Sequence, residues 1–237
     1  MKGFCIPISS LIPSNRNAMY ELISLCFMGV EREFFEKDLL EKDYVVLLYQ
    51  DNDLAGFSTF TIRPSIDIEN RTATILCSGD TIIHPKHWGS SALGRTLIQS
   101  AWDLHRQSER ESFWWLLITS GPRTWGVLPT FFKIFQPHPI LPKDLLLEKW
   151  TRKLCEDRWP GRQDSMSNLI RLPHPQKLRP PLDKLPTSRL KNSGVRWYVD
   201  VNPNWYNGDE LPSLVQIHPS NLTRAGWRYL SEYLKTK

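Results

Sequence analysis

The pattern of apolar and polar positions divides the first part of the chain into short strands and amphipathic helices. Residues 13–27 and 31–41 carry apolar side chains at helical spacing, and a proline stands at the start of the first segment. Residues 4–9 alternate, and residues 44–49 form a run of β-branched and aromatic side chains. An Asp-Asn-Asp turn follows, and residues 54–62 complete a hairpin.

The pattern continues after a loop at residues 64–71. Residues 72–83 predict a strand, residues 90–105 a helix with one apolar face, and residues 112–118 a strand apolar enough to be buried on both faces. Residues 128–135 predict a short apolar helix. The expected order is therefore β-α-α-β-β-β-α-β-α, an α/β chain with a mixed sheet.

The remainder of the chain has a different character, with nine prolines between Pro137 and Pro186. We expect a helix over residues 143–159, irregular chain over residues 163–193 and a late strand over residues 195–201, which would supply a further sheet edge. A last amphipathic helix begins at Pro219 or Ser220.

Composition bounds the class of protein. A chain of 237 residues with 41% hydrophobic residues and ten tryptophans can bury a substantial core. The sequence contains no run of eighteen apolar residues and no secretory leader pattern, so we expect a cytoplasmic protein without membrane attachment. Four cysteines lie far apart, and neither they nor the six histidines have metal-ligand spacing, so we expect no metal and reduced, buried thiols.

A net charge of +5 suits an acidic partner such as a nucleotide cofactor, an acyl carrier protein or nucleic acid. The basic residues are spread thinly among acidic ones, however, which favours a moderately basic soluble protein and argues against nucleic acid.

Candidate chemistry lies in the strand–turn–helix unit of residues 72–98. A helix N-terminus leaves backbone N–H groups without partners and attracts anions, and small residues let a phosphate approach closely. Ile83-His84-Pro85 ends the strand. Two alignments of the following loop are possible: one places Trp88, Gly89, Ser91 and Leu93 at motif positions, and the other reads Lys86 to Ser91.

With three earlier strand candidates before it, this unit resembles the pyrophosphate loop of the GNAT acyltransferase superfamily, over about residues 4–140. The resemblance implies a GNAT-like acyl-CoA N-acyltransferase fold with a Pro/Trp-rich C-terminal extension. The core would be residues 1–140, and residues 141–237 would complete the sheet and cover the acceptor side. Acetyl-CoA or another acyl-CoA would lie between the strands of residues 72–83 and 112–118.

The resemblance also assigns site residues. Ile82, Ile83 and His84 would offer backbone contacts to the cofactor. The pyrophosphate would be capped by a run of small and aromatic residues: Trp88, Gly89, Ser90, Ser91 and Ala92.

Two side chains are catalytic candidates. GNAT enzymes often place an acidic base on this strand, which points to Asp80, and an imidazole can accept a proton near neutral pH, which points to His84. Asp80 could equally be a solvated strand-edge residue, and His84 could be without chemical role. The tyrosine that often protonates the leaving thiolate is replaced by Phe131-Phe132-Lys133.

Three functions remain open at this point. The first is an N-acyltransferase acting on an amine of a small molecule, amino acid or peptide. The second is a GNAT-like domain that acts on a carrier-protein thioester, by acyl transfer or decarboxylation. The third is a non-catalytic basic module that works through residues 171–198. A homodimer is compatible with each.

Overall fold

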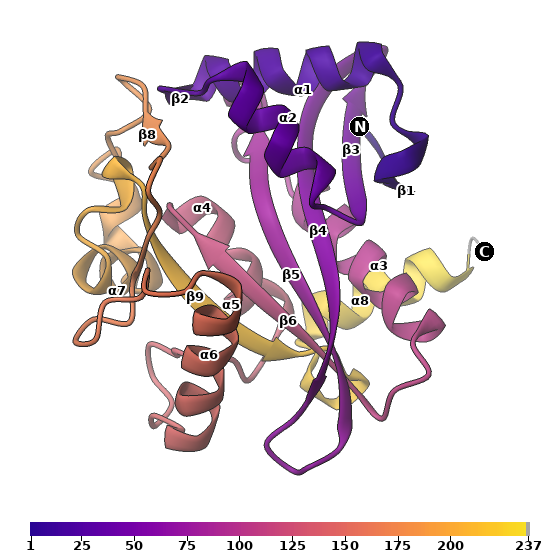
Figure 1. Ribbon diagram of the computed structural model, residues 1–237, viewed down its shortest axis with the longest axis vertical. Coiled ribbons are helices and arrows are strands. Elements are labelled where there is room, and N and C mark those ends of the chain that lie inside the picture. The colour runs from indigo at the N-terminus through magenta and orange to yellow at the C-terminus, as the bar shows by residue number, and fades with distance from the viewer. Residues whose placement is uncertain (236–237) are drawn as a thin grey trace.

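The computed structural model describes residues 1–235, and within them a seven-stranded sheet forms the centre of the molecule (Figure 1). The strand order is β1-β3-β4-β5-β6-β9-β7, with β5 and β6 parallel and the other neighbours antiparallel. This confirms the predicted α/β class with a mixed sheet. The strands are β1 (Lys2–Pro7), β3 (Tyr44–Gln50), β4 (Asp53–Ile66), β5 (Thr72–Ile83), β6 (Ser112–Thr119), β7 (Ile170–Arg171) and β9 (Asp209–Gln216).

Helices cover both faces of the sheet, and two short strands, β2 (Phe27–Met28) and β8 (Lys177–Leu178), pair with each other apart from it. The helices are α1 (Pro13–Cys26), α2 (Arg32–Leu40), α3 (Ala92–Gln107), α4 (Pro122–Trp125), α5 (Val127–Phe131), α6 (Leu145–Arg158), α7 (Ser193–Val201) and α8 (Arg224–Lys235). None of the described helices is both long and apolar enough to span a bilayer.

Alternation along the strands builds two cores. Val46 and Leu48 of β3 pack in the cluster that contains α3, α5 and α8, whereas Val45 and Leu47 pack with α1 and α2. Farther along the sheet, α6 packs on β5 and β6 through Leu147, Trp150 and Cys155. All eight residues of β6 are buried, as expected for a strand covered on both faces.

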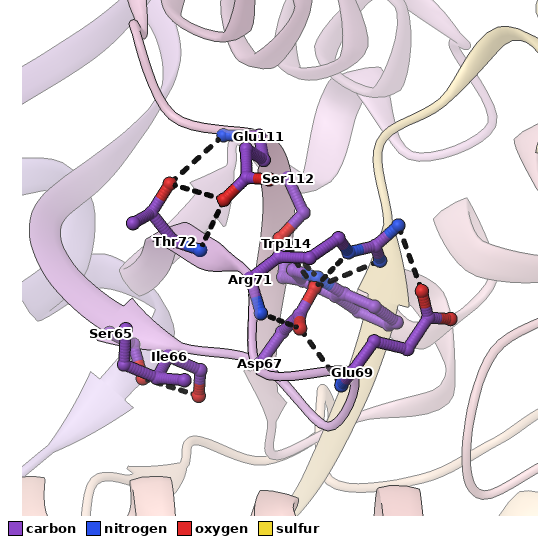
Figure 2. A network of polar contacts seen from close by, with 9 residues as sticks. All are labelled: Ser65, Ile66, Asp67, Glu69, Arg71, Thr72, Glu111, Ser112 and Trp114. Atoms are coloured by element: carbon purple, nitrogen blue, oxygen red, sulfur yellow. Dashed lines mark hydrogen bonds and ion pairs between the residues drawn. The ribbon is translucent and has the colours of Figure 1, made fainter.

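A buried carboxylate anchors the turn between β4 and β5 (Figure 2). Asp67 accepts the backbone N–H groups of Glu69 and Arg71 at 2.9 and 3.0 Å, Arg71 Nε at 2.9 Å, and Ser112 Oγ at 2.8 Å. Trp114 Nε1 donates in turn to Ser112 Oγ at 3.3 Å. Burial works to raise the pKa of Asp67, but these hydrogen bonds outweigh it and lower that pKa. The turn thus ties β5 to β6 where their parallel pairing begins.

Most of the predicted elements are confirmed, with β5 at its predicted bounds. Smaller differences concern the bounds of three elements. β4 continues to Ile66, into the predicted loop, and α5 ends at Phe131, so residues 132–135 are not helical. The last helix, α8, begins at Arg224 and not at Pro219 or Ser220, because Pro219–Asn221 forms a separate 3-10 turn.

The prediction of a strand over residues 195–201 is wrong, because this segment is helix α7. Asn192 caps the helix by accepting Val195 N–H at 3.1 Å, and buried Tyr198 donates from its hydroxyl to Thr119 O at 2.6 Å. The cap and the burial of one helical face outweigh the β propensity of the valines and aromatic residues.

The late sheet strand is β9 instead, which the pattern missed because of Pro212. Leu214 exchanges backbone hydrogen bonds with Gln136 on the side away from β6. Pro212, two residues earlier, turns its nitrogen to that same outer side, beyond the two residues that pair with β7. A proline is tolerated there because no ladder hydrogen bond is required of it.

Candidate functional site

The parallel strands β5 and β6 separate near their carboxyl ends. Their last partners are Ser78 and Leu117, and β5 then continues to Ile83 without β6 beside it. The separation follows a bulge in which Gly79 and Asp80 oppose the single residue Thr59 of β4. A Cβ on Gly79 would lie 2.6 Å from Thr59 Oγ1, so the bulge requires a glycine.

The backbone of β5 faces the resulting gap at alternate residues. His84 N–H donates to Ala55 O of β4 at 2.8 Å, which places the backbone groups of residues 82 and 84 on the β4 side. Thr81 and Ile83 therefore turn their backbone groups toward the gap. In agreement, Ile83 O accepts Trp88 Nε1 at 3.1 Å.

On one face of the sheet, the gap opens into a cavity of about 750 Å³, the α3-side cavity. Its lining includes Thr81 and Ile83 of β5, the loop residues 88–91, residues 122–127 after β6, and residues 192–195 at the start of α7. The first turns of both α3 and α7 border it, and each helix start offers backbone N–H groups.

Cationic side chains stand in the α3-side cavity. Arg123 stacks its guanidinium 3.5 Å from the ring centre of Trp88, and Arg189 also lines the wall. The Nε of Arg123 and the Nε1 of Trp125 are buried without a hydrogen-bond partner among the described residues. Burial, and then Arg189, lower the pKa of Arg123 to about 10. Two guanidinium groups held together in this way can bind an anionic ligand.

Not all of the predicted loop residues line the α3-side cavity. Trp88, Gly89, Ser90 and Ser91 line the α3-side cavity, whereas Ala92 packs in the core. Gly89 has a φ of +107°, a conformation that favours glycine, and lets the chain turn into α3.

Of the predicted strand residues, Ile83 lines this cavity. Ile82 packs with α1 and α2 and lines a second cavity on the other face of the sheet, and His84 lines neither of the two. The His84 Nδ1 accepts Lys86 N–H at 3.1 Å, which makes this histidine a local cap.

On the other face, the gap opens into a second cavity of about 480 Å³, the α2-side cavity. Its walls come from α2, the end of β6, the first residues of β9 and residues 172–176. Aromatic side chains form much of the surface: Phe27, Phe34, Phe35 and Trp159.

Carboxylates from three elements face the α2-side cavity. Asp80 of β5 accepts Gln176 Nε2 at 3.1 Å, and Asp38 of α2 pairs with Lys42 Nζ at 2.7 Å. Among the described residues no hydrogen bond or ion pair reaches the carboxylate of Glu210, which comes from β9.

This environment favours the protonated carboxyl groups. Burial raises the pKa of Asp80 to about 6, with a further rise from Asp38 against the opposing charge of Lys42. Burial, followed by the charge of Asp80, raises the pKa of Glu210 to about 8. Groups with such pKa values can take up and release protons near neutral pH.

The two cavities meet at the gap, because Thr81 and Thr124 line both. A ligand on the α3 side can therefore reach a ligand on the α2 side between the separated strands. Cys77 is not available as a nucleophile: its thiol is buried and its pKa is raised to about 11. Residues 1–235 contain no group of three or more His, Cys, Asp or Glu that could hold a metal ion.

Sequence reasoning proposed Asp80 and the loop as site residues, a prediction that stays open. It placed Arg189 only in the basic surface over residues 171–198 and did not single out Arg123 or Glu210. Arg123 and Glu210 follow breaks in the pattern rather than forming a motif: Arg123 comes directly after Gly121-Pro122, and Glu210 is the second residue of the strand that Pro212 concealed. For Glu210, the sequence signal is a carboxylate near the start of a late strand.

Comparison with known proteins gives results at the level of structure only. No protein-family model and no curated protein matches the chain. Solved structures that match include ribosomal-protein-S18-alanine N-acetyltransferase from Escherichia coli, with 11% identity over 60% of this chain and 85% of that chain and a TM-score of 0.41. A GNAT family acetyltransferase from Brucella melitensis in complex with acetyl-CoA matches with 11% identity over 48% and 75% and a TM-score of 0.34.

An acetyltransferase of the GNAT family from Streptococcus pneumoniae matches with 14% identity over 57% of this chain and 88% of that chain and a TM-score of 0.37. The predicted resemblance to the GNAT superfamily is confirmed as a likeness of the chain's arrangement. Likeness at this level carries no argument about ligands or reaction, which have to come from the two cavities of this chain.

Proposed function

We propose that the protein is an N-acyltransferase that moves an acyl group from an acyl-CoA thioester to an amine. The observation that carries the proposal is the meeting of two chemically different cavities at the gap between β5 and β6. One cavity is suited to an anionic ligand and the other to an ammonium group, and the two are in contact only where the strands have separated.

The α3-side cavity fits the acyl donor. Arg123 and Arg189, together with the N-terminal turns of α3 and α7, would hold the phosphate groups, and the buried unpartnered Nε of Arg123 marks a hydrogen bond left for a ligand. The gap-facing backbone of Thr81 and Ile83 would pair with the extended arm of the donor. When bound, acyl-CoA supplies the reactive thioester.

The α2-side cavity fits the acceptor and the base. Asp80 or Glu210 would take a proton from the acceptor's ammonium group, which leaves a nucleophilic amine. Backbone N–H groups of β5 that face the gap would stabilise negative charge on the thioester oxygen. In the transfer, the amine nitrogen bonds to the acyl carbon, the carbon–sulfur bond breaks, and the sulfur leaves as a thiolate.

The leaving thiolate does not require a tyrosine here. No tyrosine is among the described residues that line the α3-side cavity, where Phe131 stands instead. Because a thiol has a pKa near 8.5, the thiolate is a tolerable leaving group near neutral pH and can take its proton from water. Of the two protons that the ammonium group releases, one balances the thiol and the other passes to solvent.

Thermal unfolding with acetyl-, malonyl- and long-chain acyl-CoA tests the proposal. A ligand at about 100 times its dissociation constant adds roughly 2.7 kcal/mol to native stability, so Tm should rise by several degrees. Arg123→Ala should weaken that shift, whereas Arg224→Ala, at the start of α8, should leave it unchanged. If none of the three donors shifts Tm, free acyl-CoA is not the donor.

A further inference from the structure

The α2-side cavity differs from an open groove because a segment of chain crosses it. The segment Leu172 to Arg179, here called the strap, leaves β7 and reaches the connection between α1 and α2. There β8 pairs with β2, and Arg179 Nε donates to Ser24 O at 2.8 Å and Phe27 O at 3.0 Å. Figure 1 shows β8 and β2 side by side.

The strap also makes contacts over the cavity itself. His174 stacks on Phe34 of α2, with 4.5 Å between ring centres, and Gln176 donates to Asp80. All of these residues line the cavity. The strap therefore joins the α2 wall to the catalytic candidate on β5 and closes one side of the space.

Size and closure together limit the acceptor. A volume of about 480 Å³ falls in the range of pockets that enclose small molecules. A polypeptide acceptor needs a path for the chain that follows its amino group, and the strap occupies that side.

Charge limits the acceptor further. Five carboxylates line the cavity against two lysines, Lys37 and Lys42. Of the five, Asp38 is paired with Lys42 at 2.7 Å and Glu41 with Arg158 at 3.4 Å. The carboxylates are Glu31, Asp38, Glu41, Asp80 and Glu210. A positively charged acceptor is favoured there, and one that carries its own carboxylate is repelled.

The aromatic side chains of the α2-side cavity indicate what the rest of the acceptor is like. Phe34, Phe35 and Trp159 present apolar surface and aromatic faces beside the carboxylates. Such a wall binds an apolar or aromatic body and tolerates a cation over its rings.

From these observations we infer that the acceptor is a small primary amine with an apolar body and no carboxylate, enclosed beneath the strap, and not the amino terminus of a polypeptide. The inference rests on the proposed function, since it concerns the acceptor of the same transfer. Glu210, whose carboxylate has no hydrogen bond or ion pair among the described residues and is close enough to Asp80 to be affected by its charge, is the group that receives the acceptor's ammonium.

Three acceptors that share one side chain test the inference: 2-phenylethylamine, phenylalanine, and a tetrapeptide that begins with phenylalanine. Thiol release from acetyl-CoA is measured for each, with the acetyl-CoA shift in Tm recorded on the same samples. We expect kcat/KM for 2-phenylethylamine to exceed that of the other two by about 10–100-fold. A tetrapeptide or amino acid used as well as the amine overturns the inference.

The Tm measurement distinguishes a failure of the inference on the acceptor from a failure of the proposed function. If acetyl-CoA shifts Tm but 2-phenylethylamine is not acetylated, the inference on the acceptor is wrong and the donor site stands. If acetyl-CoA gives no shift and no thiol is released, the proposed function fails and the inference falls with it.

Two variants test the roles of Glu210 and of the strap. Glu210→Gln should raise KM for 2-phenylethylamine about tenfold while leaving the acetyl-CoA shift intact, and Glu232→Gln, exposed on α8, is the matched control. Replacing Gln176 and Arg179 by alanine together should loosen the strap and raise the tetrapeptide rate relative to the amine. An unchanged ratio, in a variant with wild-type circular dichroism, contradicts the role of the strap.

Discussion

Carboxylates at the two ends of β5 have opposite surroundings. At the amino end, Asp67 is saturated with hydrogen bonds from its turn and from β6, and its pKa is lowered (Figure 2). At the carboxyl end, Asp80 accepts one side-chain hydrogen bond, Glu210 accepts none among the described residues, and both have raised pKa values.

The contrast separates a structural carboxylate from a functional one. A fully bonded carboxylate holds its charge and fixes the strands that supply its partners. A carboxylate in a cavity that lacks hydrogen-bond partners lowers the stability of the fold. Such groups are found mainly where a protein binds a ligand or a proton. The comparison predicts that Asp67 contributes to folding and that Asp80 and Glu210 contribute to turnover.

The largest expected effect is on catalysis. Asp80→Asn removes the proton acceptor while keeping the side-chain shape, so kcat should fall by about 10²–10³-fold with little change in Tm. Steady-state thiol release with 2-phenylethylamine measures the rate. A kcat within a factor of two of wild type would assign the base to Glu210 or to water.

A large loss of stability is expected at the other end of the strand. Asp67→Ala leaves Ser112, Arg71 and two backbone N–H groups without their acceptor and should lower the free energy of unfolding by about 3 kcal/mol. Urea denaturation checks this. The matched change Asp157→Ala, exposed on α6, should stay within about 0.5 kcal/mol of wild type.

A smaller effect is expected at the bulge that separates the strands. Gly79→Ala places a Cβ against Thr59 Oγ1 and should lower stability by about 1–2 kcal/mol and reduce turnover. Thr59→Ala in the same chain removes the contact and should restore part of both losses. Absence of rescue would show that the contact with Thr59 is not the cause of the losses, and would direct attention to Lys42, whose Cε would lie 3.1 Å from the same Cβ.

The smallest effect concerns pH. Because the folded pKa of Glu210 is raised to about 8, the folded state binds a proton that the unfolded state releases, so stability falls as pH rises from about 4.3 toward 8. Glu210→Gln removes that contribution and should flatten the decline. Chemical denaturation at pH 5, 7 and 8.5 measures it, and an equally steep decline in the variant would contradict the raised pKa.

The sequence predicted the parts of the fold that depend on local pattern. The bounds of β5 and the position of the loop at residues 88–91 follow from apolar runs, a proline and small residues, which act over a few positions. Asp80 is selected through the GNAT resemblance, in which this strand often carries an acidic base, and its role stays a prediction.

The rest depends on contacts between distant segments. Residues 195–201 have strand propensity but become α7 because Tyr198 is buried against the end of β6. The carboxylate of Glu210 and the guanidinium of Arg123 acquire their surroundings only when β9, α4 and the strap meet the gap, and no local pattern encodes that meeting.

The pairing of β6 with β9 has a consequence for the nascent chain. Trp114 pairs with Gln216, so one edge of β6 has no sheet partner until the chain has been synthesised as far as β9. During that interval the sequence Ser-Phe-Trp-Trp-Leu-Leu-Ile-Thr presents an unpaired, uncharged and strongly apolar edge, the kind of segment that seeds aggregation. A chain truncated before Asp209 should therefore be recovered mainly from inclusion bodies, and co-expression with a chaperone should matter most for such truncations.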